Sequence, residues 1–269
     1  MKMRKKYKLG IIGLGHMGVA IARGAVNKEF LERYEIAVYD KSEHARKDSE
    51  QEGFAYLDSY HDLVSSSHIV LIAVTPQQSE NVFDGLQGEE IDVLLSIVTG
   101  VSIQHIQDRL NNVPVIRAMP NTPLQIGEGA TAMCMSANTK ADDYDFVFQL
   151  FSSMGVTRTI PEDKMNEIVA VHGSTPAYVY YFVQCILKDA VARGIDEADA
   201  RALLVQTVIG SGKLLAKNAD KPLSDLIDEV CSKGGTTIEA ISEMESQHMD
   251  QIIHDADEKC IKRAYELGK

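Results

Sequence analysis

Short runs of apolar and mostly β-branched residues alternate with amphipathic stretches through the first part of this chain. The runs occupy residues 9–12, 36–39, 69–74, 93–98, 113–116 and 130–135. Alternation of this kind predicts βαβ units and a parallel sheet. The run at 69–74 has no polar alternation, which is typical of a strand covered by helices on both faces. We therefore expect a doubly wound α/β fold of the Rossmann type here.

The hydrophobic spacing becomes helical after Pro161. Helices are predicted over residues 164–172, 177–193, 197–217, 223–230 and 248–267, with breaks at Gly194, Pro222 and the glycine pair at 234–235. The apolar positions of 202–215 favour a core or subunit seam. The sequence thus predicts an α/β domain over residues 1–160 and an all-helical domain over 161–269.

Composition narrows the class of ligand. The formal net charge is -12, and proteins that bind nucleic acid or anionic lipid rely on basic patches, so neither partner is expected. The four cysteines are far apart and form no C-x-x-C pair, which argues against a zinc site or a disulfide framework and favours a reducing compartment. The apolar stretch near the start is too short and glycine-broken for a signal or a membrane span. We expect a cytoplasmic protein with a small-molecule substrate and no metal.

A glycine-rich motif follows the first predicted strand and opens the first helix. Gly13, Gly15 and Gly18 have the G-x-G-x-x-G spacing, with His16 and Met17 between them. In this context the glycines allow a tight turn, close approach to a pyrophosphate and helix–strand packing. The helix N-terminus then faces the phosphates. We predict that these five residues contact NADH or NADPH.

Asp40 ends the second strand and is a candidate for discriminating between the two cofactors. An acidic residue here commonly accepts hydrogen bonds from the adenosine ribose and repels a 2′-phosphate, which favours NADH. Lys41, Ser42 and Arg46 follow at once and could instead hold that phosphate. Asp40 could also be the N-cap of the helix near Glu43. All three readings stay open at this point.

Two further loops are expected at the carboxyl edge of the sheet, where open α/β folds bind ligands. Ala73, Thr75 and Pro76 follow one predicted strand, and Thr99 and Gly100 follow the next. We predict that all five lie at the cofactor. The alternative is that Pro76 and Gly100 only shape turns.

Three segments carry small hydroxyls or open backbone N–H groups beside predicted helix starts, namely residues 117–123, 172–178 and 231–237. The last begins a helix after two glycines, so its N–H groups and hydroxyls could cradle a carboxylate. Simple helix capping is the alternative.

With these segments in view, the chain resembles the pyrroline-5-carboxylate reductase family over nearly its whole length. The resemblance is carried by residues 13–18, 73–77, 118–123 and 173–178, by Gln206, and above all by residues 230–238. It implies a Rossmann domain followed by a helical domain that interlocks with a second subunit. The active site would then form where two subunits meet, in a homodimer or an oligomer of dimers.

The resemblance also implies a chemistry. A nicotinamide hydride would reduce the cyclic imine 1-pyrroline-5-carboxylate to L-proline. Met119 and Asn121 would lie by the nicotinamide. The substrate-binding residues would be Ser174, Ser232, Gly234, Gly235, Thr236 and Thr237. The hydroxyl of Thr237 would lie close to the ring nitrogen and serve as the catalytic, mainly positioning, group.

Four residues depart from the family pattern. Lys233 replaces a usual proline, His172 a small residue, Thr75 a common lysine, and Asp40 is unusual where NADPH is used. These departures motivate one alternative, a catalytically idle paralogue that binds dinucleotide and dimerises.

A second alternative is a β-hydroxyacid dehydrogenase. It would need a lysine base on the first long helix of the second domain, where Lys164 and Lys188 are the nearby lysines. Neither lysine lies in the glycine-containing motif expected there.

Overall fold

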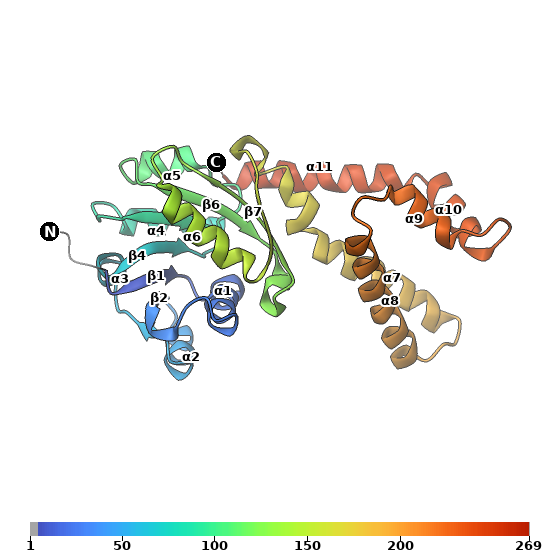
Figure 1. Ribbon diagram of the computed structural model, residues 1–269, viewed down its shortest axis with the longest axis horizontal. Helices are drawn as coiled ribbons and strands as arrows, with labels where there is room; N and C mark the ends of the chain where they lie inside the picture. Colours follow the sequence, from blue (N-terminus) through green and yellow to red (C-terminus); the bar gives the residue numbers. More distant parts are fainter. Residues whose placement is uncertain (1–4, 269) are drawn as a thin grey trace. The chain divides into compact units, whose positions relative to one another are not determined.

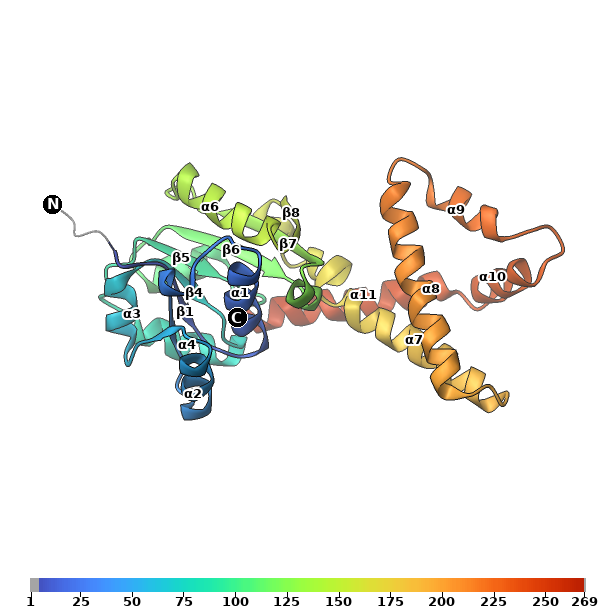
Figure 2. The same ribbon diagram turned by 60° about the horizontal axis from the view of Figure 1, so that its bottom comes forward.

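The computed structural model describes residues 5–268 as two compact units. Residues 5–176 and 260–268 form the sheet unit, and residues 177–259 form the helical unit. The last helix ends among the elements of the sheet unit (Figure 2). The compact units therefore differ from a division between residues 160 and 161, and that functional boundary stays a prediction.

The sheet unit is built on one eight-stranded sheet (Figure 1). The strand order is β3-β2-β1-β4-β5-β6-β7-β8, and β1 to β6 run parallel. This is the doubly wound Rossmann-type arrangement that the hydrophobic pattern predicts. The strands are β1 (Tyr7–Ile12), β2 (Ile36–Tyr39), β3 (Ala55–Tyr56), β4 (Ser67–Ile72), β5 (Val93–Ser96), β6 (Val115–Pro120), β7 (Gly129–Met135) and β8 (Gly155–Thr159).

The direction of β7 corrects the expectation of a wholly parallel sheet. β7 pairs antiparallel with β6, with Ala118 opposite Met133, and β8 pairs parallel with β7. The connection from Pro120 to Gly129 holds only a 3₁₀ turn (Thr122–Ile126). A parallel return needs a crossover of a dozen or more residues, so this link allows only an antiparallel strand.

Helices cover both faces of the sheet. One core contains residues of α1 (His16–Asn27) and α6 (Ala141–Ser152). The opposite core contains residues of α3 (Tyr60–Ser66), α4 (Pro76–Gly85) and α5 (Ile103–Arg109). Along β4, Ile69 and Leu71 enter the first core while Val70 and Ile72 enter the second. Burial of each such side chain contributes about 1.5–3 kcal/mol, so β4 is fixed from both sides. The remaining helix of this unit is α2 (Glu43–Gln51).

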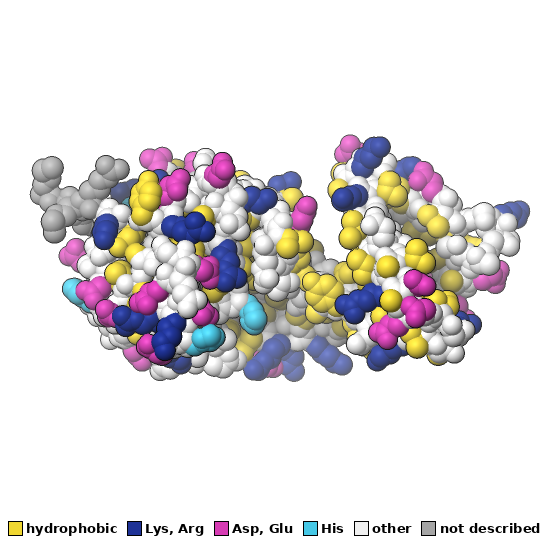
Figure 3. All heavy atoms as spheres, turned by 90° about the horizontal axis from the view of Figure 1, so that it is seen from below, with side chains coloured by type: hydrophobic (Ala, Val, Ile, Leu, Met, Phe, Trp, Pro, Cys, Tyr) yellow, Lys and Arg dark blue, Asp and Glu magenta, His cyan; other side chains and the backbone are white. Residues whose placement is uncertain are grey.

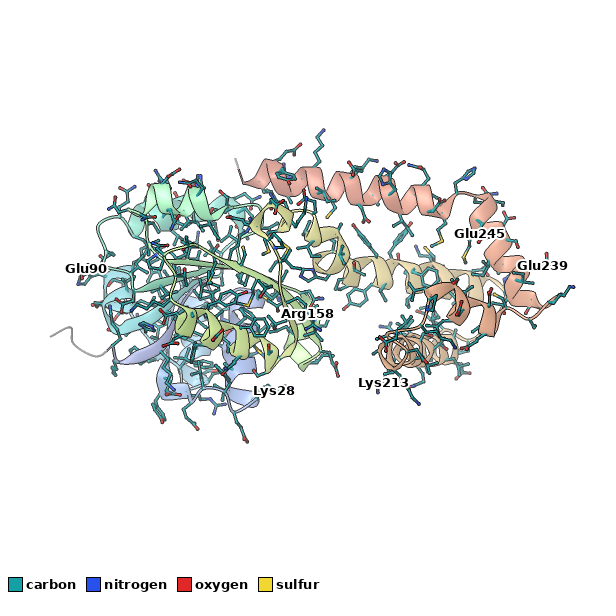
Figure 4. All side chains as sticks on the ribbon, turned by 45° about the horizontal axis from the view of Figure 1, so that its top comes forward. Lys28, Glu90, Arg158, Lys213, Glu239 and Glu245 are labelled. Atoms are coloured by element: carbon teal, nitrogen blue, oxygen red, sulfur yellow. The ribbon has the colours of Figure 1, made fainter. Side chains whose placement is uncertain are left out.

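The helical unit contains residues of α7 (Thr175–Ala192), α8 (Glu197–Lys217), α9 (Leu223–Val230), α10 (Thr236–Ser246) and α11 (Met249–Leu267). Figure 4 labels Lys213 on α8 and Glu239 and Glu245 on α10. The start of α8 is set by Asp196, whose carboxylate accepts from the N–H groups of Ala198 and Asp199. Both ends of α8 and α9 agree with the sequence prediction.

The predicted helix over residues 164–172 is wrong. A 3₁₀ turn (Glu162–Lys164) is followed by a π-helical turn (Val169–Gly173). Side chains reach into this segment and bond its carbonyl groups: Thr175 Oγ1 donates to Ala170 O and Val171 O. Such contacts compete with a regular α-helical ladder, and π-turns are frequent at functional sites.

None of the residues of α7, α8, α9 and α10 is fully buried. Leu203 is 72% exposed, Tyr181 68% and Val230 67%, and Figure 3 shows hydrophobic side chains (yellow) on the surface of this unit. Apolar surface on this scale marks an interaction site in a folded protein. None of the described helices is long and apolar enough to cross a membrane.

Candidate cofactor and substrate site

The glycine motif forms a tight turn between β1 and α1. Gly13 has φ +98° and its N–H bonds Tyr39 O at 2.9 Å. A Cβ on Gly18 would overlap the carbonyl oxygen of Gly13, so this glycine permits close packing of α1 on the turn. A Cβ on Gly15 would meet no atom within 4 Å. Gly15 therefore borders open space, as the glycine that faces a pyrophosphate must.

Two hollows meet at this turn. One, of about 290 Å³, is lined by predicted cofactor residues, namely Gly13, Gly15, Asp40, Lys41, Ala73 and Thr75. The other, of about 430 Å³, is lined by Gly15, His16 and Gln125 among others. The N-cap of α1 is Gly15, which supplies no side-chain cap. The first N–H groups of α1 thus remain available to an anion.

Asp40 has a fixed orientation at the wall of the first hollow. Its Oδ2 accepts from Leu14 N at 2.7 Å and its Oδ1 from Ser42 N at 2.8 Å. The N-cap of α2 is Ser42, whose Oγ accepts from Ala45 N, so the suggestion that Asp40 caps this helix is wrong. Each carboxylate oxygen keeps a second lone pair, which can accept from a ribose hydroxyl.

Arg46, a candidate partner for a 2′-phosphate, is already paired. Its Nη1 lies 2.8 Å from Asp58 and its Nε 3.1 Å from Glu50, and its guanidinium lies 4.9 Å from the centroid of the Tyr56 ring. The pKa of Arg46 is raised mainly by the hydrogen bond to Glu50 and further by the charge of Asp58. Lys41 is the cation that lines the hollow.

The loop after β4 also lies at this edge, because Ala73 N donates to Ile12 O at 2.8 Å. Thr75 is the N-cap of α4 and Pro76 begins the helix. The hollow also has Tyr60, Gln78 and Asn81 in its wall, which were not predicted. Gln78 and Asn81 follow Pro76 on the first turns of α4, so the loop position could have indicated them.

Gly100 is explained by packing. It has φ +86°, and a Cβ would overlap Ala264 O and lie 2.8 Å from Gly268 N, at the end of α11. This favours the alternative that Gly100 shapes the chain, and the predicted cofactor contacts of Thr99 and Gly100 stay predictions.

Met119 and Asn121 lie where β6 reaches the carboxyl edge. Met119 is 6% exposed and Asn121 8%. Asn121 Nδ2 donates to His172 O at 3.1 Å, and its Oδ1 accepts from Ala130 N at 2.8 Å. The Asn121 amide therefore ties the end of β6 to the π-turn and to β7.

Ser174 follows the π-turn directly. Its N–H donates to Val169 O at 2.9 Å, and its hydroxyl lies 3.1 Å from Cys260 Sγ on α11. Within the sheet unit, the turn before Ser174 is thus joined to Asn121 through His172 O and to Met119, whose carbonyl oxygen lies 2.7 Å from His172 Nε2. Arg117, two residues before Met119, is 2% exposed and bonds Asn166 Oδ1 at 2.6 Å. Burial lowers its pKa, and the side chain belongs to the core.

The remaining predicted substrate residues form a turn at the start of α10 in the helical unit. Gly234 has φ +72°, and Gly235 N donates to Ser232 O at 2.9 Å. Gly235 is the N-cap without a side-chain cap, and Thr236 and Thr237 begin the helix. The first N–H groups of α10 are consequently free for a carboxylate. Lys233 is exposed.

A Rossmann-type sheet, an uncapped helix behind a glycine turn and a carboxylate at the end of β2 define a dinucleotide-binding protein. Residues 8–100 match the family described as "NADP oxidoreductase coenzyme F420-dependent". Residues 162–267 match the family described as "Pyrroline-5-carboxylate reductase dimerisation".

Relatives extend over the whole chain. Pyrroline-5-carboxylate reductase of Synechocystis sp. is 33% identical, covering 97% of this chain and 98% of the relative. That of Glycine max is 32% identical, covering 98% and 97%. A solved structure of Plasmodium falciparum pyrroline carboxylate reductase with NADP bound has a TM-score of 0.88 and 27% identity, covering 99% and 100%. The chain belongs to the pyrroline-5-carboxylate reductase family.

Proposed function

We propose that this protein reduces 1-pyrroline-5-carboxylate to L-proline with a nicotinamide dinucleotide. The observation that carries the proposal is the turn at residues 232–237, where an uncapped helix start follows two glycines and offers N–H groups and hydroxyls. This donor set suits the carboxylate of a small substrate. The relatives and the dimerisation family match support the same reaction.

The residues around the first hollow fit the cofactor. The N-terminus of α1 and Gly15 would hold the pyrophosphate, and Asp40 would hold the adenosine ribose. Thr75, Thr99 and Asn121 follow β4, β5 and β6, and Met119 lies at the end of β6. When bound, the nicotinamide supplies a hydride.

The protein contributes orientation more than acid–base chemistry. The hydride adds to the imine carbon, which is C2 of the pyrroline ring and becomes C5 of proline, and the ring nitrogen carries the proton that makes this carbon an electrophile. We propose that the N–H groups of Thr236 and Thr237 fix the substrate carboxylate, with Ser174 and Ser232 as further hydroxyl contacts. The Thr237 hydroxyl would hydrogen-bond the ring nitrogen and position it.

The test is oxidation of NADH and NADPH by the purified protein with the five-membered imine and, in parallel, its six-membered homologue. We expect turnover with the five-membered ring. Thr237→Ala should lower kcat by about 10-fold or more while cofactor affinity stays within about twofold. Cofactor binding without turnover of either imine would refute the proposal and favour an idle paralogue, and activity on hydroxyacids that Lys164→Ala abolishes would favour a dehydrogenase.

We also propose a homodimer through the helical domain, with the boundary near residue 160. The exposed apolar side chains of α7 and α8 support the homodimer, because they line a hollow of about 780 Å³. Val205 and Ile209 are among the lining residues. Sedimentation should show a dimer or an oligomer of dimers, and Val205→Asp should dissociate it with loss of turnover. The four free cysteines support a cytoplasmic location.

A further inference from the structure

His172 bridges two backbone segments beside the predicted nicotinamide residues. It lies in the π-turn, where its Nδ1 is 3.0 Å from Ile168 O. Its Nε2 is 2.7 Å from Met119 O at the end of β6. The ring therefore joins the turn that precedes Ser174 to the strand end that carries Met119 and Asn121.

Both partners of the ring are carbonyl oxygens, which only accept hydrogen bonds. A neutral imidazole donates from one nitrogen and presents a lone pair on the other. One of the two contacts would then set a lone pair against a carbonyl oxygen. Both hydrogen bonds of His172 form together only when the ring carries two protons, and bonds from a charged donor are the stronger kind.

The backbone of His172 adds a third connection. Asn121 Nδ2 donates to His172 O while Asn121 Oδ1 accepts from Ala130 N. The packing leaves little slack, since a Cβ on Gly173 would lie 3.1 Å from Val169 Cγ2 and 3.8 Å from Met119 Sδ. A change at the ring would therefore shift the position of the end of β6.

Ionisable groups on the surrounding elements have other partners, except that the Oε2 atom of Glu167 is buried without one. On β6, Arg117 bonds Asn166 and lies 3.7 Å from Glu162. Glu167, at the start of the turn, accepts from Tyr265 on α11. Cys260 of α11 contacts the Ser174 hydroxyl.

We propose that His172, with both ring nitrogens protonated, is a positioning residue that holds the end of β6 and the Ser174 turn in one arrangement. This rests on the proposed function, because Met119 and Asn121 are taken as neighbours of the nicotinamide and Ser174 as a substrate contact.

The experiment compares the full-length protein with His172→Gln, His172→Ala and a control, His61→Gln, which removes an exposed histidine bonded to Glu89. His172→Gln keeps one donor for Met119 O, while His172→Ala keeps none. We expect kcat to fall roughly fivefold in the first and roughly 30-fold in the second, with cofactor Kd within about twofold, as displaced reacting groups lower kcat.

Unchanged kcat in both variants would overturn the proposal. Thermal unfolding of each variant identifies a folding defect, and the smaller loss of kcat in His172→Gln, which keeps a donor for Met119 O, distinguishes positioning from a purely structural role. The ring state is read separately by ¹⁵N NMR of histidine-labelled protein at pH 6.5, with the His172 signals assigned by their loss in His172→Gln. Two protonated nitrogens are expected, and a neutral ring would refute the clamp even if the wild type reduced no imine. A wild type that lacks turnover refutes the proposed function instead.

Discussion

Asp40→Asn should weaken the preference of this protein for NADH over NADPH. The carboxylate is held at the wall of the first hollow by the N–H groups of Leu14 and Ser42. It is thus oriented before a dinucleotide binds. The obvious rescuing cation, Arg46, is paired with Asp58 and Glu50. We therefore expect the wild type to bind NADH more tightly than NADPH.

The magnitude follows from the charge and position of Asp40. Two unit charges about 5 Å apart interact by about 3 kcal/mol at an effective dielectric constant of about 20. Asp40 is partly exposed, so solvent screening reduces the repulsion of a 2′-phosphate to about 1.5 kcal/mol, or roughly tenfold in affinity. Loss of a charged acceptor for the ribose hydroxyls weakens NADH binding by a similar amount. The ratio of the two Kd values should change by about 10- to 100-fold.

Kd for each nucleotide can be measured by fluorescence titration without substrate, and kcat/KM with it. Glu43→Gln is the matched control, because it removes one negative charge on the first turn of α2 without lining the hollow. Asn keeps one acceptor for the Leu14 or Ser42 N–H, so a stability loss of about 1–2 kcal/mol is expected and is checked by urea unfolding. An unchanged Kd ratio in Asp40→Asn, or a wild type that prefers NADPH, would refute the reasoning.

Three further predictions follow from particular contacts. Arg46→Ala should leave Kd for NADPH within about twofold, because the guanidinium is paired elsewhere; a large loss in titration would contradict this. Gly18→Ala should cost about 1–3 kcal/mol in urea unfolding and also impair dinucleotide binding, whereas Gly15→Ala should impair binding alone, since its Cβ would meet only open space. The pKa of the Cys134 thiol is raised to about 12, mainly by burial and further by the charge of Glu162. The thiol should therefore resist alkylation at pH 8 in the native state. The stability that this thiol contributes is present below about pH 9 and is lost as pH rises toward 12, which thermal unfolding of Cys134→Ala should show as a shallower decline.

The elements best predicted from the sequence are those whose ends are set by local residues. β2 occupies residues 36–39 as expected, with its first three residues buried and the polar turn at Asp40 following it. α8 and α9 end at the predicted residues because Asp196, Asn218 and Pro222 punctuate the chain there. In such segments the period of the apolar residues and the capping residues agree.

The predicted direction of β7 was wrong, although the sequence contained the information needed to predict it. The apolar run predicted a strand correctly, but its direction depends on the connection from Pro120 to Gly129. The number of residues in that connection is too small for a parallel crossover. β3 was missed for a different reason, since two residues at an edge give no alternation to read.

The π-turn and the reason for Gly100 lay beyond local sequence reasoning. Residues 164–172 have helical spacing, yet the turn at 169–173 is set by bonds from His172 to Met119, 53 residues earlier. Gly100 fits against Ala264 and Gly268 of α11, a contact that only the return of the last helix creates. Loops of the candidate site were predicted because parallel strands bring their carboxyl ends together. The hydrogen-bond partners of individual side chains, such as that of Asn121, could not be predicted in this way.

The two compact units differ in how far their apolar side chains are buried. The first hollow, Asp40 and the α1 N-terminus all belong to a sheet unit whose two cores are fully buried. The turn at 232–237 belongs to a unit in which α7 to α10 have no fully buried residue. Apolar helices without a core gain stability only from a partner surface. The match of residues 162–267 to a dimerisation family indicates that a second copy supplies such a surface. We therefore propose that the elements that would bind substrate depend on association, whereas those that would bind the dinucleotide do not. The glycine turn of the sheet unit was predicted from a short motif, whereas helix capping remained an alternative for residues 231–237 until the resemblance over the whole chain was considered.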